Sequence, residues 1–209
     1  MQIAKIEEIT KDRCRVTLDT EESFVLYKGE IRLLKLKPDT ALSDDIYRQI
    51  TTVVLPKRCK LRAMNLLKAR PYTEYQLRKK LLEGGYSEET AGIALDYVKS
   101  FGYVNDKQYA LDFIRQQTEN RSKKELYMKL LGKGIDKEIL DQAFSETYGS
   151  LEDVKEQTYD ETAVIVKTLK KRGFSPDMSY EDKQKLLAYF YRRGFEMDSV
   201  YKAMDSLKD

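Results

Sequence analysis

Clusters of lysine and arginine are the groups in this sequence whose type and spacing could do chemistry. Ammonium and guanidinium groups bind phosphates and carboxylates through charge-assisted hydrogen bonds. Several clusters fall at matching places in a repeated apolar pattern, so stacked repeats would line them along one surface. Two interpretations stay open: a surface that binds phosphates or acidic protein, and a face that is merely solvated. The clusters are Lys57-Arg58-x-Lys60-x-Arg62, Arg78-Lys79-Lys80, Lys123-Lys124, Lys170-Lys171-Arg172 and Arg192-Arg193.

Catalytic chemistry is poorly supported by the remaining residue types. The chain has no histidine, the commonest general base and metal ligand. Cys14 and Cys59 stand far apart without a second pair, which argues against a zinc site or a disulfide framework and suits a reducing cytoplasm. The basic neighbours of Cys59 could lower its thiol pKa, but no histidine is present to activate it. We therefore predict no catalytic residue, no metal, no cofactor and no enzymatic activity.

The composition indicates a helical and well-solvated protein. Of 209 residues, 35% are charged and four are proline, and the net charge is +3. The charge is uneven, because residues 56–104 carry ten basic and five acidic side chains. No apolar run reaches membrane-spanning length, and the start lacks the apolar region of a signal peptide. We expect a cytoplasmic, monomeric protein.

A repeated frame organises the chain. Each copy has two apolar residues four apart, a glycine four further on, and an alanine nine residues after that glycine. The spacing predicts a helix, a left-handed glycine turn and a second helix that approaches closely at the alanine. Self-similarity of this period is typical of helical repeat arrays. The copies are Leu77, Leu81, Gly85 and Ala94; Leu126, Leu130, Gly134 and Ala143; and Leu186, Phe190, Gly194 and Ala203.

The fold class that follows is mainly α. We predict three tandem three-helix repeats in an elongated curved array, preceded by a small antiparallel β-hairpin or sheet. Alternating apolar residues up to about residue 27 indicate the strands, and Pro56 is expected to end or kink the helix before it. A bend is expected around Tyr148-Gly149-Ser150 and 173–176. The predicted boundaries are 1–42 for the β-rich extension, 43–56 for a linking helix, and 57–104, 105–150 and 151–209 for the repeats.

Aromatic residues follow the same frame. The residue after each glycine is apolar or aromatic, and we expect it to plug the space beneath the turn. Tyr86, Tyr103 and Tyr109 are predicted to be core residues. The other tyrosines of the fifteen in the chain could stack on bases or lie in interfaces.

A resemblance to a known family rests on three segments. The joint at 101–110, Phe-Gly-Tyr-Val-Asn-Asp-x-x-Tyr-Ala, resembles the Leu-Gly-Tyr-Ile-Asp-Asp-x-x-Tyr-Ala joint of the RecX family. Upstream, Arg70-Pro71 followed by Thr73-Glu74 is similar to the entry of that family's second helix, and Lys129-Leu130-x-x-Lys133-Gly134-Ile135 matches a further element. The match covers about 57–209, and the start resembles the extension of longer members. Family-motif residues with structural roles are Gly85, Tyr86, Gly102, Tyr103, Asp106, Tyr109, Ala110, Gly134 and Gly194.

This resemblance implies a non-enzymatic regulator of the recombinase RecA in recombination, DNA repair and the SOS response. It implies binding to RecA, as monomer and in the groove of DNA-bound filaments, with inhibition of strand exchange and ATP turnover. The basic clusters, with Arg70 and Lys129, are then candidates for contact with RecA or DNA. We expect Arg78, Lys79, Lys80, Lys123 and Lys124 to lead.

Two other functions remain open from the sequence. Two helices joined by a glycine turn also suit helix-turn-helix docking, so the chain could be a DNA-binding module that acts on single- or double-stranded DNA directly. A HEAT-type scaffold fits the helices but leaves the joint at 101–110 unexplained.

Overall fold

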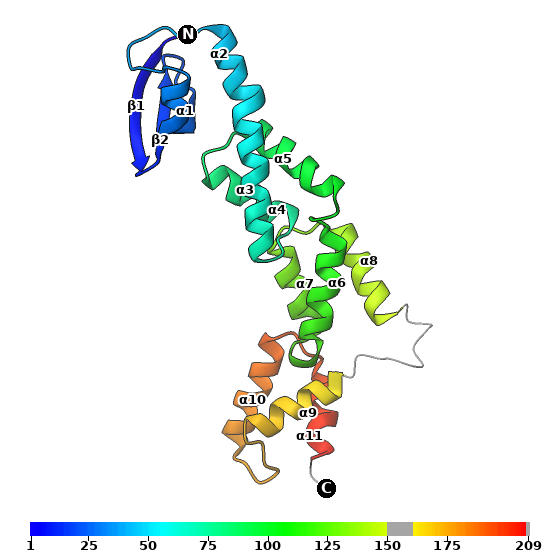
Figure 1. Ribbon diagram of the computed structural model, residues 1–209. Coiled ribbons are helices and arrows are strands. Elements are labelled where there is room, and N and C mark those ends of the chain that lie inside the picture. The colour runs from blue at the N-terminus through cyan, green and yellow to red at the C-terminus, as the bar shows by residue number, and fades with distance from the viewer. Residues whose placement is uncertain (150–160, 208–209) are drawn as a thin grey trace. The chain divides into compact units, whose positions relative to one another are not determined.

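The computed structural model describes residues 1–149 and 161–207 (Figure 1). They form two compact units, Met1–Asn105 and Asp106–Asp209. The predicted fold class is confirmed, since the chain is mainly helical with one small antiparallel sheet at its N-terminus. Within the described residues, no helix is long and apolar enough to cross a membrane.

The first unit begins with a three-stranded sheet, β1 (Ile3–Thr10), β2 (Arg13–Leu18) and β3 (Ser23–Tyr27), in the order β1-β2-β3. Alternate residues of β2 and β3 face inward, where Val16 and Leu26 are completely buried. The short helix α1 (Lys28–Leu33) follows β3. The apolar face of the sheet packs on a helix through a core that includes Ile50 and Leu55.

That helix runs without interruption through α2 (Asp44–Arg48), a π-helical segment (Gln49–Val54) and α3 (Leu55–Ala69). Pro56 does not end the helix, which was one of the two outcomes expected for it. Pro56 lies in the first turn of α3, where proline's missing N–H costs little. The helix is instead altered just before Pro56, where the backbone hydrogen bonds follow the wider π-helical spacing over Gln49–Val54.

The first three-helix bundle combines α3 with α4 (Glu74–Glu83) and α5 (Glu88–Ser100). A capping box starts α4: Thr73 Oγ1 accepts from the Gln76 N–H at 3.2 Å, and Gln76 accepts from the Thr73 N–H. Between α4 and α5, Gly85 has a φ of 88°, the left-handed turn that the frame predicts.

The second unit contains two further bundles. Ala143 and Ala203 are completely buried, as their places in the frame predict, and Gly134 and Gly194 have positive φ. Each bundle has its own apolar core. The helices are α6 (Asp106–Gln117), the 3-10 turn Thr118–Asn120, α7 (Lys123–Leu131), α8 (Lys137–Tyr148), α9 (Glu161–Lys171), α10 (Tyr180–Arg192) and α11 (Met197–Asp205).

The tyrosine predictions were partly wrong. Tyr86 and Tyr109 are half-buried, but Tyr103 is 53% exposed and stacks on Phe101 with ring centroids 5.8 Å apart. The chain turns outward at Gly102, and Val104 takes the buried position instead. Of the segment predicted to bend, Ser150 lies outside the described residues.

Candidate binding surface

The structure supports no nucleophile or metal centre in the described residues. They contain no group of three or more Asp, Glu, Cys or His side chains placed to hold a metal ion. Cys59 is completely buried, and burial raises the pKa of its thiol to about 12. The expectation that neighbouring cations lower this pKa is wrong, since burial disfavours the thiolate more strongly than they favour it.

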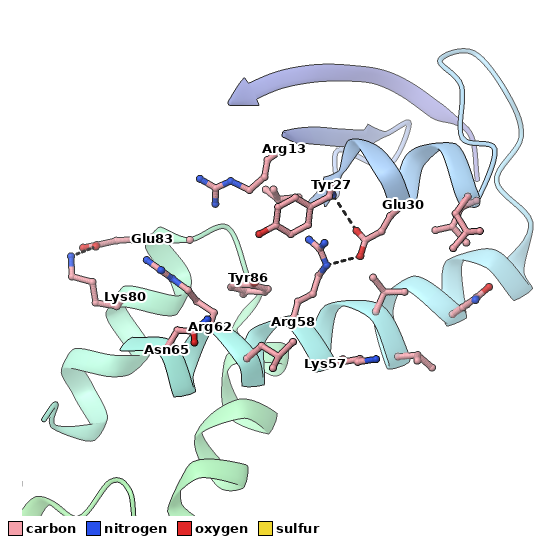
Figure 2. A pocket seen from close by; sticks show the side chains of 18 residues that line it. Arg13, Tyr27, Glu30, Lys57, Arg58, Arg62, Asn65, Lys80, Glu83 and Tyr86 are labelled. Atoms are coloured by element: carbon pink, nitrogen blue, oxygen red, sulfur yellow. Dashed lines mark hydrogen bonds and ion pairs between the residues drawn. The ribbon is translucent and has the colours of Figure 1, made fainter. Parts of the chain in front are cut away.

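A groove in the first unit gathers several of the predicted cations (Figure 2). It has a volume of about 890 Å3. Its walls come from β2, the end of β3, α1, the helix through α3, and the end of α4 with the turn after it. We call it the cationic groove, because five basic side chains line it against two acidic ones. These are Arg13, Lys57, Arg58, Arg62 and Lys80, with Glu30 and Glu83.

Arg58 holds the wall of the groove together. Its Nε pairs with the Glu30 carboxylate, and its guanidinium lies 3.6 Å from the centroid of the Tyr27 ring. Glu30 also accepts a hydrogen bond from the Tyr27 N–H at 3.1 Å, which caps α1. The Arg58 side chain is only 17% exposed. Arg58 therefore positions the wall more than it offers charge to a ligand.

The accessible charge of the groove comes from its other cations. Lys57 and Arg62 are exposed side chains of α3, and both line the groove. Lys80 reaches Glu83 at 2.7 Å in an exposed pair that solvent weakens. Tyr86 points toward the groove, and burial raises the pKa of its phenol. An anionic partner is the ligand that this net positive lining suits.

Other predicted residues of the first unit lie away from the groove. Lys60 lies over the Tyr97 ring at 4.9 Å, and Arg70 over Tyr72 at 4.4 Å. Arg78 pairs with Glu88 at 2.8 Å and reaches Glu74 at 4.0 Å. Lys79 is exposed. The two basic clusters of this unit therefore wrap around their helices instead of sharing one face.

In the second unit, three predicted cations meet at one pocket: Lys171, Arg172 and Arg193. The other candidates lie outside its lining. Lys123 covers the Tyr148 ring at 4.4 Å, Lys124 contacts the turn at Gly194, and Lys129 lies 3.9 Å from Glu125. Lys170 and Arg192 are exposed.

Sequence reasoning missed Arg13 of the groove and Arg121 and Lys167 of this pocket. Each lies outside the runs of lysine and arginine that were singled out, so clustering along the chain gave no signal. Only the folding of β2 beside α3, and of α9 beside residues 118–121, brings them to a shared surface.

Comparison with known proteins supports the motif-based resemblance. A model of the first three-helix domain of RecX matches residues 59–97, and a model of the third three-helix domain matches residues 160–204. The chain therefore contains RecX domains. The matched segments contain the first and third copies of the glycine-centred frame, so these two repeats match RecX domains.

Curated RecX proteins match along nearly the whole chain. The regulatory protein RecX of Caldanaerobacter subterraneus is 29% identical over 191 residues, which is 91% of each chain. That of Finegoldia magna is 27% identical and covers 95% of this chain and 96% of its own. Both matches leave fewer residues of this chain uncovered than the sheet contains, so each must include part of the sheet. These proteins therefore share the N-terminal extension with this chain.

Solved structures show the same fold. A crystal structure of regulatory protein RecX aligns with a TM-score of 0.62 and 21% identity over 98% of both chains. RecX from Lactobacillus salivarius aligns with a TM-score of 0.58 and 22% identity, over 74% of this chain and 97% of its own. The RecX domains and the curated relatives support a regulatory role for this chain.

Proposed function

We propose that this protein is a non-catalytic cytoplasmic regulator that binds RecA and DNA-bound RecA filaments. It inhibits strand exchange and the ATP hydrolysis that accompanies it, and thereby modulates homologous recombination and DNA repair. The observation that carries the proposal is the cationic groove. Part of its lining, including Arg62 and Lys80, lies in the domain that the RecX model matches, and its charge suits the acidic surfaces and phosphates of a nucleoprotein filament.

The cations of the groove have different roles. Lys57 and Arg62 are exposed and can reach a partner's carboxylates or phosphates. Arg58 keeps the sheet against α3 through Glu30 and Tyr27. Contact with the partner therefore depends on the first two, and the shape of the groove on the third.

The decisive experiment measures DNA-dependent ATP hydrolysis by RecA with this protein at substoichiometric amounts. The wild type should slow hydrolysis. Reversing charge at Lys57 and Arg62 together should raise the concentration needed by at least about tenfold, the scale of losing two charged contacts. Lys68→Glu is the matched control, because Lys68 is exposed on the same helix but outside the groove. Equal inhibition by the variant and the control would refute the assignment.

Lys79 is a better second test than Arg78. A carboxylate at position 78 would face Glu74 and Glu88, so its effect on inhibition would be mixed with a loss of stability. Lys79→Glu changes the charge by the same amount as Arg78→Glu would, and it does so on an exposed side chain.

Direct action on DNA is the second candidate, and the excess of cations in the groove favours it too. Binding to single- and double-stranded DNA should be measured across salt, with and without RecA. Tight binding to bare DNA that weakens steeply with salt would support this candidate. Binding that needs RecA would support the first.

A further inference from the structure

A second cationic site lies in the other unit, where the second and third repeats meet. It is a pocket of about 390 Å3 formed by residues 120–121, between α6 and α7 of the second repeat, and by α9 and the end of α10 in the third. We call it the inter-repeat pocket. Five cations line it, and none of its described lining residues is acidic. Its lining is Asn120, Arg121, Lys167, Thr168, Lys171, Arg172, Tyr189 and Arg193.

The cations of the pocket differ in their surroundings. Glu125 on α7 pairs with Arg121, and its Oε2 lies 2.9 Å from Arg193. This one carboxylate therefore lies against two cations of the pocket at once. Lys171 and Arg172 are exposed at the C-terminal end of α9. Close cations of this kind repel one another unless an anion lies between them.

Tyr189 shows what kind of ligand the pocket can take. Arg172 covers its ring at 3.6 Å from the centroid, and Arg193 lies 5.3 Å from it. Arg193 also donates a hydrogen bond to the phenol oxygen. Burial opposes ionisation, but the hydrogen bonds from Arg193 and Arg172 outweigh it and hold the pKa of the Tyr189 phenol below its usual 10. The arginine over the ring leaves little room for a base to stack there, while the converging donors suit an oxyanion.

We propose that the inter-repeat pocket binds a phosphate group. Arginine and lysine side chains from both repeats would surround it, with Lys171 and Arg172 on one side and Arg121 on the other. The group can belong to a free phosphate compound or to a nucleic-acid backbone, which present the same chemistry. The proposal does not depend on RecA binding.

Binding there would join the two repeats. Polar contacts cross this joint: the Ser122 hydroxyl donates to the Arg193 carbonyl, and Arg193 pairs with Glu125. A phosphate held by residues of both sides adds links to this polar set. By linkage, a ligand that binds only the joined arrangement stabilises it.

The test uses the full-length protein without RecA. Binding of inorganic phosphate, pyrophosphate and a short single-stranded oligonucleotide is measured by calorimetry, at an ionic strength held constant with chloride. The methylphosphonate form of the same oligonucleotide lacks backbone charge and reports on it. Lys171→Glu is the test variant, and Lys170→Glu is the control, because Lys170 is the neighbouring exposed lysine outside the pocket.

We expect saturable binding by the wild type and by Lys170→Glu, and affinity about tenfold weaker in Lys171→Glu, the scale of losing one charge-assisted hydrogen bond. Lys171-dependent binding of phosphate or pyrophosphate identifies a free phosphate as ligand. Lys171-dependent binding of the charged oligonucleotide alone identifies the backbone. No saturable binding of any probe, or equal loss in both variants, would overturn the proposal. Since RecA is absent, this failure is distinct from failure of the proposed function.

Discussion

Two joints in this protein use the same parts and differ in character. One joins the sheet to the first repeat, and the other joins the second repeat to the third. Each has a glycine turn with positive φ pressed against a neighbour: Gly85 against Val25, and Gly194 against Lys124. Each also has an arginine paired with a glutamate, Arg58 with Glu30 and Arg193 with Glu125, and a tyrosine beside that arginine.

The difference lies in what surrounds these parts. The first joint adjoins a continuous apolar core and one uninterrupted helix from Asp44 to Ala69. Val25 is β-branched and has few positions to which it can retreat. The second joint rests on the flexible stem of Lys124 and on hydrogen bonds and ion pairs. The first should therefore resist changes of salt and pH, and the second should respond to them.

The largest effect is expected at the stiff joint. A Cβ at position 85 would lie 2.7 Å from Val25 Cγ2, on a backbone with φ of 88°. Gly85→Ala should lower the free energy of unfolding by about 3 kcal/mol, from left-handed strain and overpacking together. Urea denaturation measures it. Gly102→Ala is the control, since its φ is 70° but no atom lies within 4 Å; it should cost only about 1 kcal/mol. Equal costs would refute the stiff contact.

The next effect concerns Glu125 at the polar joint. Its side chain is 18% exposed, and although burial opposes ionisation, hydrogen bonds from Arg193 and Arg121 lower its pKa from 4.5. A lowered folded-state pKa means that the stabilisation is complete above the usual value and is lost as pH falls through the lower one. Glu125→Gln should cost about 1–2 kcal/mol at neutral pH and remove this acid dependence.

Urea unfolding at several pH values measures the effect of Glu125→Gln. Glu83→Gln is its control, because Glu83 also has a lowered pKa, through Lys80, but lies at the surface. We expect the free energy of unfolding of the Glu83→Gln variant to equal that of the wild type. Loss of stability in both variants alike would show that the joint is no more sensitive than the surface.

A smaller effect than that of Gly85→Ala is expected for Gly194→Ala. Its φ is 75°, and an added Cβ would meet the Lys124 side chain at 2.9 Å. The outer part of that side chain can swing into solvent, but its Cβ, at 3.0 Å, is fixed to the backbone. The cost should therefore be about 2 kcal/mol, between those of Gly102→Ala and Gly85→Ala. A cost as large as that of Gly85→Ala, measured in the same urea series, would remove the distinction between the two joints.

The smallest change concerns reactivity. Cys59 is buried with its thiol pKa raised to about 12, so its alkylation in the native protein should be very slow. In a Cys14→Ala background, labelling should speed up when Gly85→Ala weakens the first unit and stay unchanged in Gly194→Ala. Acceleration by Gly194→Ala would contradict this. Mass spectrometry after timed exposure to iodoacetamide gives the rates.

The repeat frame could be predicted because its causes are local. Helical neighbours lie three and four residues apart, and only glycine adopts positive φ without strain, so Leu77, Leu81 and Gly85 specify a helix and its turn wherever they stand. The caps at Thr73 and Ser87 follow for the same reason. Tyr103 could not be predicted in this way, because the turn at Gly102 gives the buried place to Val104.

Spacing along the chain thus specified the helices, their glycine turns and the RecX motifs. The two charged sites depend on packing that brings residues distant in sequence to line one pocket, Arg13 and Lys57 in one and Arg121 and Lys171 in the other. Successive residues on a helix point in different directions, so a run of basic residues does not share one face. Lys171 lines the inter-repeat pocket, for example, whereas its neighbour Lys170 does not. Which cations share a surface is therefore decided by how the elements pack together, and local periodicity in the sequence does not determine that packing.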